Sequence, residues 1–234
     1  MNLVMLEWRK MRRLRVGLIL AAMVGVVVLF SLSSTLSSWP GVMLSVGTVS
    51  ALVSPVFLAV LASRQTDMEH TGAGWTAYAA VGVGRGQMSR AKILALAPFI
   101  VLAVLVQLGL VMWQAGLGPV TEVGLWVYFV VGLVVTNLVL LSAHVLLSAV
   151  ADNQLISIGI GALGSFAAVV SLLFPPWAAM LHPWGYYALS TPTEFTDGAI
   201  VYSTPHWGLL AGFTLASTLI LFIALVRVHR TQEA

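Results

Sequence analysis

Side chains that could do chemistry are scarce in this sequence, and most of them gather in one stretch, DMEHTGAGWTAYAAVGVGRGQMSRAK, residues 67–92. Glycines beside basic residues can bind phosphate, but a P-loop requires G-x-x-x-x-G-K-[ST] after a strand. The chain contains no Lys-Ser or Lys-Thr pair, and GVGRGQMS lacks the spacing of a dinucleotide site. We therefore expect that the chain does not bind or hydrolyse ATP and is not an enzyme by itself.

A second set of polar residues lies in an apolar stretch further along the chain. Asn137, His144 and Ser148 are separated by intervals that place them on one face of a helix. Such a face could line a translocation path or form hydrogen bonds between helices. A metal site needs several converging ligands, and the chain has no cysteine and no acid near His144. No metal or cofactor is therefore expected on this chain.

The composition indicates that lipid is the solvent for most of the chain. Its 234 residues are 59% hydrophobic and 8% charged, whereas a soluble domain carries about 25% charged residues. Crossing a bilayer takes about 20 mainly apolar residues, and continuous apolar runs favour helices over alternating strands. We expect an all-α membrane protein with six transmembrane helices within residues 16–227. The expected spans are Val16–Leu32, Val42–Ser63, Ile93–Trp113, Gly124–Val150, Leu155–Pro175 and Trp207–Val226.

The basic residues predict the orientation of these spans. All 11 Lys and Arg lie before the first span, between the second and third, or after the sixth. With six spans these segments fall on one side, which the positive-inside rule assigns to the cytoplasm. Both termini are then cytoplasmic, with residues 228–234 as a tail. The loops of the opposite side carry acids only: Glu122, Glu194 and Asp197.

Three segments outside the spans are expected to have structure. Residues 1–15 form an amphipathic helix in the membrane interface, with Trp8 on its apolar face, although Glu7 is an anomaly within that face. Residues 64–92 are longer than a helix connection requires, and we expect one or two short helices there. Residues 175–206 are aromatic and Pro-rich, and they either cap the bundle on the outside or form a partly ordered loop.

Small residues in the fifth span predict close helix packing. Ser157, Gly161 and Ser165 follow one another at intervals of four, which gives a small-xxx-small face. This face could serve packing within one chain or dimerisation.

The layout resembles the membrane subunit of type-2 ABC exporters. That plan has an amphipathic surface helix, six spans, a cytoplasmic coupling helix between spans two and three, and extra structure outside between spans five and six. Glu69, Gly74, Trp75, Arg85 and Lys92 stand where the first cytoplasmic loop of that family carries similar residues. The usual proline before the loop arginine is replaced here by AVGVGR.

Two further patterns look most like the lantibiotic- and bacitracin-immunity branch of that family. One is the segment HTGAGW, which begins at His70. The other is the Leu-Glu-x-x-Lys opening formed by Leu6, Glu7 and Lys10, with the polar turn ADNQ at residues 151–154 as a weaker likeness. The resemblance implies that Glu7, Trp8 and Lys10 belong to the surface helix.

The resemblance also implies a partner. A separate ABC ATPase would bind ATP and Mg and would dock on the polar loop between spans two and three. Arg85, Arg90 and Lys92 could instead serve only as positive-inside anchors. The residues implied in coupling to the ATPase are Glu69, His70, Trp75, Tyr78, Arg85 and Lys92.

The expected function is that of a permease subunit of an ATP-driven exporter in a bacterial cytoplasmic membrane. It would contact membrane lipid, pair with a second permease that is identical or different, and export or clear an amphipathic peptide or antibiotic. Nucleic acid is not an expected partner. The alternatives are an autonomous six-span carrier or channel for a small solute, and an intramembrane enzyme. A carrier predicts buried ionisable residues or repeated halves, and an enzyme of the H-E-x-x-H type lacks its motif here.

Overall fold

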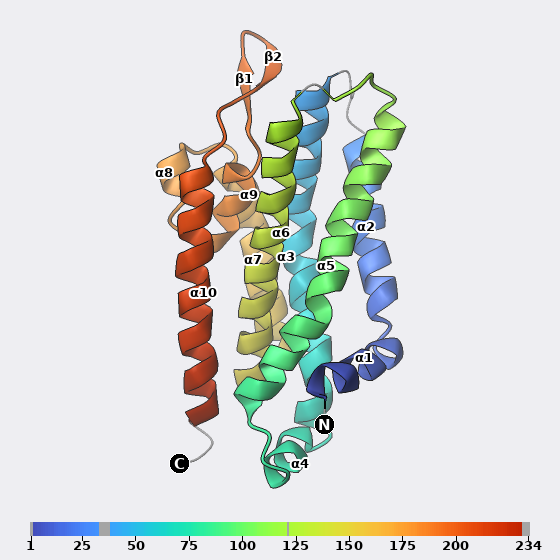
Figure 1. Ribbon diagram of the computed structural model, residues 1–234, viewed down its shortest axis with the longest axis vertical. Coiled ribbons are helices and arrows are strands. Elements are labelled where there is room, and N and C mark those ends of the chain that lie inside the picture. Colours follow the sequence, from blue (N-terminus) through green and yellow to red (C-terminus); the bar gives the residue numbers. More distant parts are fainter. Residues whose placement is uncertain (1, 33–37, 121, 231–234) are drawn as a thin grey trace.

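The computed structural model describes residues 2–32, 38–120 and 122–230, which form a bundle of long helices (Figure 1). Within this part of the chain, five helices are long and apolar enough to cross a membrane, or up to six if the bent pair α1 and α2 is one span. The predicted class, a helical membrane protein, is confirmed. The long helices are α2 (Val16–Leu32), α3 (Trp39–Thr71), α5 (Arg85–Ala115), α6 (Val123–Val150), α7 (Gln154–Ser171) and α10 (Trp207–Arg230).

The N-terminal helix α1 (Leu3–Arg13) lies across the bundle rather than along it (Figure 1). It is bent by 70° from α2, and the turn between them places Arg15 at φ 52°. The indole nitrogen of Trp8 donates a hydrogen bond to the carbonyl of Ala95 at 3.1 Å, which fastens α1 to α5. By itself α2 is about 25 Å long, shorter than the other spans, although its bounds are those predicted.

Two helices extend further than the sequence suggested. α3 continues past Ser63 to Thr71, and α5 begins at Arg85 rather than at Ile93. Arg, Gln, Met, Glu and Ala are good helix formers, so a helix that leaves the apolar zone does not have to end there. The segment expected as a loop with short helices is therefore mostly helix, with one short helix, α4 (Gly74–Ala80), between the two extensions.

The segment between α7 and α10 packs into one end of the bundle. It forms α8 (Pro176–Ala179), the 3-10 turn η1 (Pro183–Gly185) and α9 (Tyr186–Leu189). Tyr187 is fully buried and donates a hydrogen bond to the side-chain oxygen of Asn137 on α6. The hydroxyl of Tyr128 donates to the carbonyl of Leu189 at 2.7 Å. These contacts make the segment a cap rather than a loose loop.

A short hairpin follows the cap and departs from the all-α expectation. β1 (Thr193–Thr196) pairs antiparallel with β2 (Ala199–Tyr202). The turn residues Asp197 and Gly198 have φ values of 52° and 80°, as a two-residue turn with both central residues in the left-handed region requires. The Asp-Gly pair was the sequence signal for this turn.

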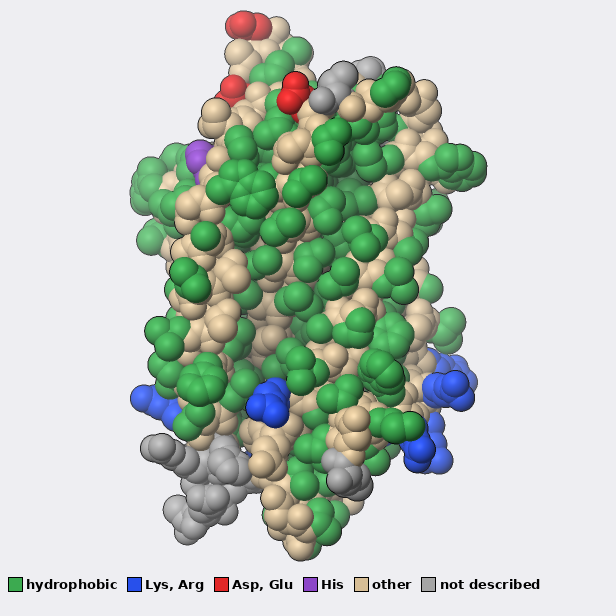
Figure 2. Space-filling model, in the orientation of Figure 1, with side chains coloured by type: hydrophobic (Ala, Val, Ile, Leu, Met, Phe, Trp, Pro, Cys, Tyr) green, Lys and Arg blue, Asp and Glu red, His purple; other side chains and the backbone are tan. Residues whose placement is uncertain are grey.

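Charge divides the molecule into two ends (Figure 2). The Lys and Arg side chains visible in that view lie toward the lower end, called the basic end below, and the acidic side chains visible there lie at the upper end, called the hairpin end. α1, α4 and the C-terminal part of α10 lie at the basic end (Figure 1). Of the tail predicted at residues 228–234, residues 231–234 lie outside the described residues.

The small-residue face of α7 packs against α3 within the chain. Ser157 and Ser165 are buried. A Cβ atom added at Gly161 would lie 2.7 Å from the Cβ of Ala59 and 2.9 Å from the carbonyl oxygen of Pro55. The backbones of the two helices can approach this closely only because position 161 has no side chain.

Replacing Gly161 by leucine is expected to destabilise the bundle by about 1–3 kcal/mol, because the added atoms overpack the α3–α7 contact. Gly159 is the matched control, since a Cβ there would meet no atom within 4 Å. Thermal unfolding in detergent should show a lower transition temperature for Gly161→Leu than for Gly159→Leu. Equal transitions for the two variants would contradict the close packing.

Candidate functional site

Glycines shape the two turns that hold α4 at the basic end. Gly72 caps α3, and Ala73 at φ 51° turns the chain back. A Cβ at Gly74 would lie 2.9 Å from the Cα of Glu69, so α4 starts directly against the end of α3. Gly82, at φ 76°, forms the second turn before α5. The glycine cluster thus makes tight turns, which explains its presence without a phosphate site.

The buried face of α4 is anchored by Trp75. Its side chain is almost completely buried and forms a cluster with Met88 on α5 and Ala149 on α6. The guanidinium of Arg85 lies 5.2 Å from the centre of its ring, within the range of a cation–π contact. α4 is therefore fixed to the ends of several helices and does not hang as a free loop.

His70 connects α4 to the turn between α6 and α7. Its Nε2 atom is 2.8 Å from the carbonyl oxygen of Ser148. Its Nδ1 atom accepts from the indole nitrogen of Trp75 at 3.3 Å and lies 2.9 Å from a carboxylate oxygen of Asp152. A neutral ring protonated at Nε2 donates to Ser148 and accepts from Trp75. One imidazole on α3 thereby links α4 to α6.

The outer face of α4 is small and uncharged. Thr76, Ala77, Ala79 and Ala80 are all exposed, and Val81 just beyond the helix is 66% exposed. The residues that face outward can accept close contact from another surface because they carry neither long side chains nor charges.

A buried ionic cluster lies behind α4, where α1, α3 and α5 meet. It contains the carboxylates of Glu7 and Glu69 and the ammonium groups of Lys10 and Lys92. Lys10 is 2.6 Å from an oxygen of each carboxylate. Lys92 is 3.2 Å from Glu7 and 2.9 Å from Glu69. Each ammonium group therefore bridges both carboxylates in a closed ring of four charges.

Gln65 completes the hydrogen bonding of this ionic cluster. Lys92 donates to its backbone carbonyl at 2.6 Å, and its side-chain amide donates to Glu7 at 3.1 Å. Glu7 and Lys92 have no exposed side-chain surface, whereas Lys10 retains 15%. Charges removed from water are tolerated only when they are paired and hydrogen-bonded, and here both conditions are met.

The ionic cluster is electrically neutral, because two positive groups face two negative ones. Burial by itself would lower the pKa of Lys10, but the hydrogen bonds that its ammonium group donates to the carboxylates of Glu69 and Glu7 outweigh burial and raise that pKa above its ordinary value. The Lys10 ammonium therefore stays charged at physiological pH, and α1 stays bound to α3 by ion pairs.

The structure revises the surface expected from the sequence. Glu69, Trp75 and Lys92 are buried and hold the basic end together, so their side chains do not lie on an outer surface. Tyr78 is half-buried, with the Lys10 ammonium 5.2 Å from its ring centre. A charged side chain can be buried in apolar surroundings when an oppositely charged partner lies beside it. The sequence did not show that Glu7 is such a partner for Lys92.

Three residues with buried or bridging contacts were missed by sequence reasoning. Gln65 fell in the segment 64–92 that was expected to carry one or two short helices, Asp152 in the polar turn at residues 151–154, and Tyr187 in the segment 175–206. Glu7 gave a usable signal, because an acid within the apolar arc of a helix needs a buried cation. Lys92, next to the third expected span, was the corresponding cation.

Replacing Lys92 by methionine is expected to destabilise the protein by about 3–5 kcal/mol, because two buried carboxylates would then share one ammonium group. Arg64, which is exposed on α3, is the control, and Arg64→Met should change stability by no more than about 0.5 kcal/mol. The measurement is thermal unfolding in detergent. The double variant Glu69→Gln with Lys92→Met restores charge balance and should recover part of the loss; a single variant as stable as the control would refute the ionic cluster.

The polar face predicted on α6 is used for contacts between helices. Asn137 binds Tyr187 of the cap, and His144 Nδ1 is 3.0 Å from the hydroxyl of Ser157 on α7. The hydroxyl of Ser148 is 3.4 Å from that of Ser63 on α3. All three α6 side chains are buried, so the geometry favours the interhelical network over a water-lined path.

A cavity of about 400 Å³ opens at the hairpin end, between the cap, the hairpin and the ends of α3 and α7. Its walls mix apolar side chains with hydroxyl groups and one carboxylate, that of Glu194. Across residues 2–32, 38–120 and 122–230, no group of three or more His, Asp or Glu could hold a metal ion.

These helices and their hydropathy define an integral membrane protein. Residues 3–168 match the family described as ABC-2 family transporter protein, and the chain belongs to this family. The matched range contains α4 and every residue of the ionic cluster. The chain is thus a permease component of an ABC transporter, distinct from the P-loop ATPase with which such a component associates. A comparison with curated proteins found no match.

Proposed function

We propose that this chain is the permease subunit of an ATP-driven exporter in a bacterial cytoplasmic membrane, with its basic end in the cytoplasm. The distribution of Lys and Arg supports this orientation. Both termini then lie on the cytoplasmic side, and the cap and hairpin lie outside. ATP and Mg bind to the separate ATPase, and this chain converts movement of that partner into movement of the bundle.

The observation that carries the proposal is α4, a short helix held rigidly beyond the long helices. Its inner face is fixed by Trp75 and His70, and its outer face is small and uncharged. A bundle in a membrane needs a firm projection at which a partner can push. We assign docking to the outer face of α4, with Ala77 near its centre, in place of the buried residues Glu69 and Lys92.

The ionic cluster gives α4 a route to the rest of the bundle. Glu69 contacts the start of α4, and the same carboxylate binds Lys10 on α1 and Lys92 on α5. A displacement of α4 would therefore move α1, α3 and α5 together. His70 adds the α6–α7 turn through Ser148 and Asp152.

The proposed substrate is an amphipathic peptide or antibiotic, cleared from the membrane or exported as in lantibiotic-type immunity. The sequence resemblance supports this class, and the cavity at the hairpin end suits it, because its walls are partly apolar and partly polar. A second permease, identical or different, would complete the pathway. Within the described part of this chain, the polar face of α6 packs against other helices. This arrangement agrees with a translocation path that forms between two permease subunits.

Ala77→Glu is expected to abolish association with the ATPase partner while the permease stays folded, because a charge would enter a small, uncharged contact face. Ala199→Glu is the matched control, since Ala199 is exposed on β2 at the hairpin end. The measurement is affinity purification in detergent, with mass spectrometry of the proteins that remain bound.

Loss of a P-loop ATPase from Ala77→Glu, but not from Ala199→Glu, supports docking at α4. Retention of the ATPase by both variants would show that the ATPase docks on a surface other than α4. If the purified protein transports a solute without any ATPase, the hypothesis of an autonomous carrier replaces that of an ATP-driven exporter.

A further inference from the structure

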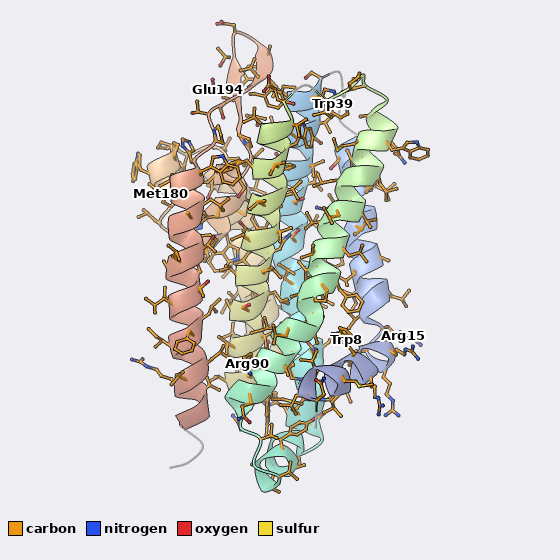
Figure 3. The ribbon with its side chains drawn as sticks, in the orientation of Figure 1. Trp8, Arg15, Trp39, Arg90, Met180 and Glu194 are labelled. Atoms are coloured by element: carbon orange, nitrogen blue, oxygen red, sulfur yellow. The ribbon has the colours of Figure 1, made fainter. Side chains whose placement is uncertain are left out.

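A cavity of about 350 Å³ lies at the basic end, between the start of α1 and the first turns of α5. The α5 residues that line it follow one another at helical spacing, so they form one stripe on that helix. Figure 3 shows Arg90 on α5 close to where α1 crosses, with Trp8 on the crossing helix. The lining consists of Asn2, Leu3 and Val4 from α1 and of Gln87, Arg90, Ala91 and Leu94 from α5.

Arg90 is the cation of this cavity. Among the residues that the structure describes, no carboxylate lies within ion-pair distance of its guanidinium. This contrasts with Lys92, two positions further along α5, which is bound by two carboxylates. The guanidinium is exposed, and a guanidinium fits the oxygen atoms of a phosphate group well.

Two amide side chains add hydrogen-bond donors to the cavity. The side-chain oxygen of Asn2 accepts from the backbone of Met5, and that of Gln87 accepts from the backbone of Gly84. With its oxygen used in this way, each amide keeps its NH₂ group for a ligand. The cavity therefore offers a cation and donors and no acid, which suits an anion.

An apolar stripe continues from the cavity along α5 into the membrane. Leu94, at the cavity wall, is followed by the exposed residues Pro98, Leu102 and Leu105. Leu94, Pro98 and Leu105 recur on the face of the helix that carries Arg90, and Leu102 lies at the edge of that face. A cationic site at the interface, joined to an apolar stripe that enters the membrane, has the two halves of a phospholipid site.

We propose that this cavity binds the phosphate headgroup of an anionic phospholipid, with an acyl chain lying along the exposed stripe of α5. The headgroup neutralises Arg90 and contacts Asn2 and Gln87, and it bridges α1 to α5. A net negative lipid is favoured over a zwitterionic one, because no acid in the cavity lining complements an ammonium group. The site is separate from α4 and does not depend on the ATPase.

The test compares the wild-type protein, Arg90→Gln and Arg64→Gln in detergent micelles that contain phosphatidylglycerol. Native mass spectrometry measures the lipid retained as its concentration is varied. Arg64 is exposed at the basic end but does not line the cavity, so its variant makes the same change of charge outside the site. We expect phosphatidylglycerol to bind about fivefold more weakly to Arg90→Gln and equally well to Arg64→Gln and the wild type. Arg90→Lys should bind more tightly than Arg90→Gln.

Three results would overturn the proposal. Equal retention of phosphatidylglycerol by Arg90→Gln and the wild type would show that Arg90 does not bind the lipid. An equal loss of lipid from Arg64→Gln would show a general effect of charge. Displacement of phosphatidylglycerol by inorganic phosphate at similar concentration would show that the cavity takes a free anion. Because Arg90 is exposed, the variant should unfold at the wild-type temperature in lipid-free detergent, which separates a lost site from a lost fold.

Discussion

Charge balance inside the ionic cluster is the constraint on which the basic end depends. Two carboxylates and two ammonium groups lie where water is largely excluded, and each is stable only beside its partners. Since Glu7, Glu69 and Lys92 come from three different helices, satisfying the charges fixes the relative positions of those helices. The start of α4 rests on Glu69, so a helix with an exposed outer face is placed by a buried side chain.

The two ends of the bundle are stabilised by different kinds of polar contact, and the middle is stabilised by close helix packing. At the basic end the contacts are ionic, whereas at the hairpin end they are neutral hydrogen bonds such as that between Tyr187 and Asn137. Between them, α7 and α3 approach closely because Gly161 has no side chain. A bundle built in this way can keep its centre intact while one end responds to a partner.

The sequence predicted the features that depend on local composition. Apolar runs located the long helices, and glycines marked both turns beside α4. It did not predict contacts that depend on tertiary placement: the pairing of Glu7 with Lys92, or the role of His70 between α4 and the α6–α7 turn. The extensions of α3 and α5 were missed because polar residues end a transmembrane run without ending a helix. The hairpin was missed although its Asp-Gly turn was visible, because the surrounding residues were read as a cap.

The distance in sequence between the partners of the ionic cluster has a consequence for biosynthesis. Glu7 and Lys92 are 85 positions apart, so the carboxylate leaves the ribosome long before its buried cation exists. Until α5 has been made, only Lys10 of the same helix can pair with Glu7, and the closed ring of four charges cannot form. α1 therefore reaches its final set of contacts only after α5 has been synthesised.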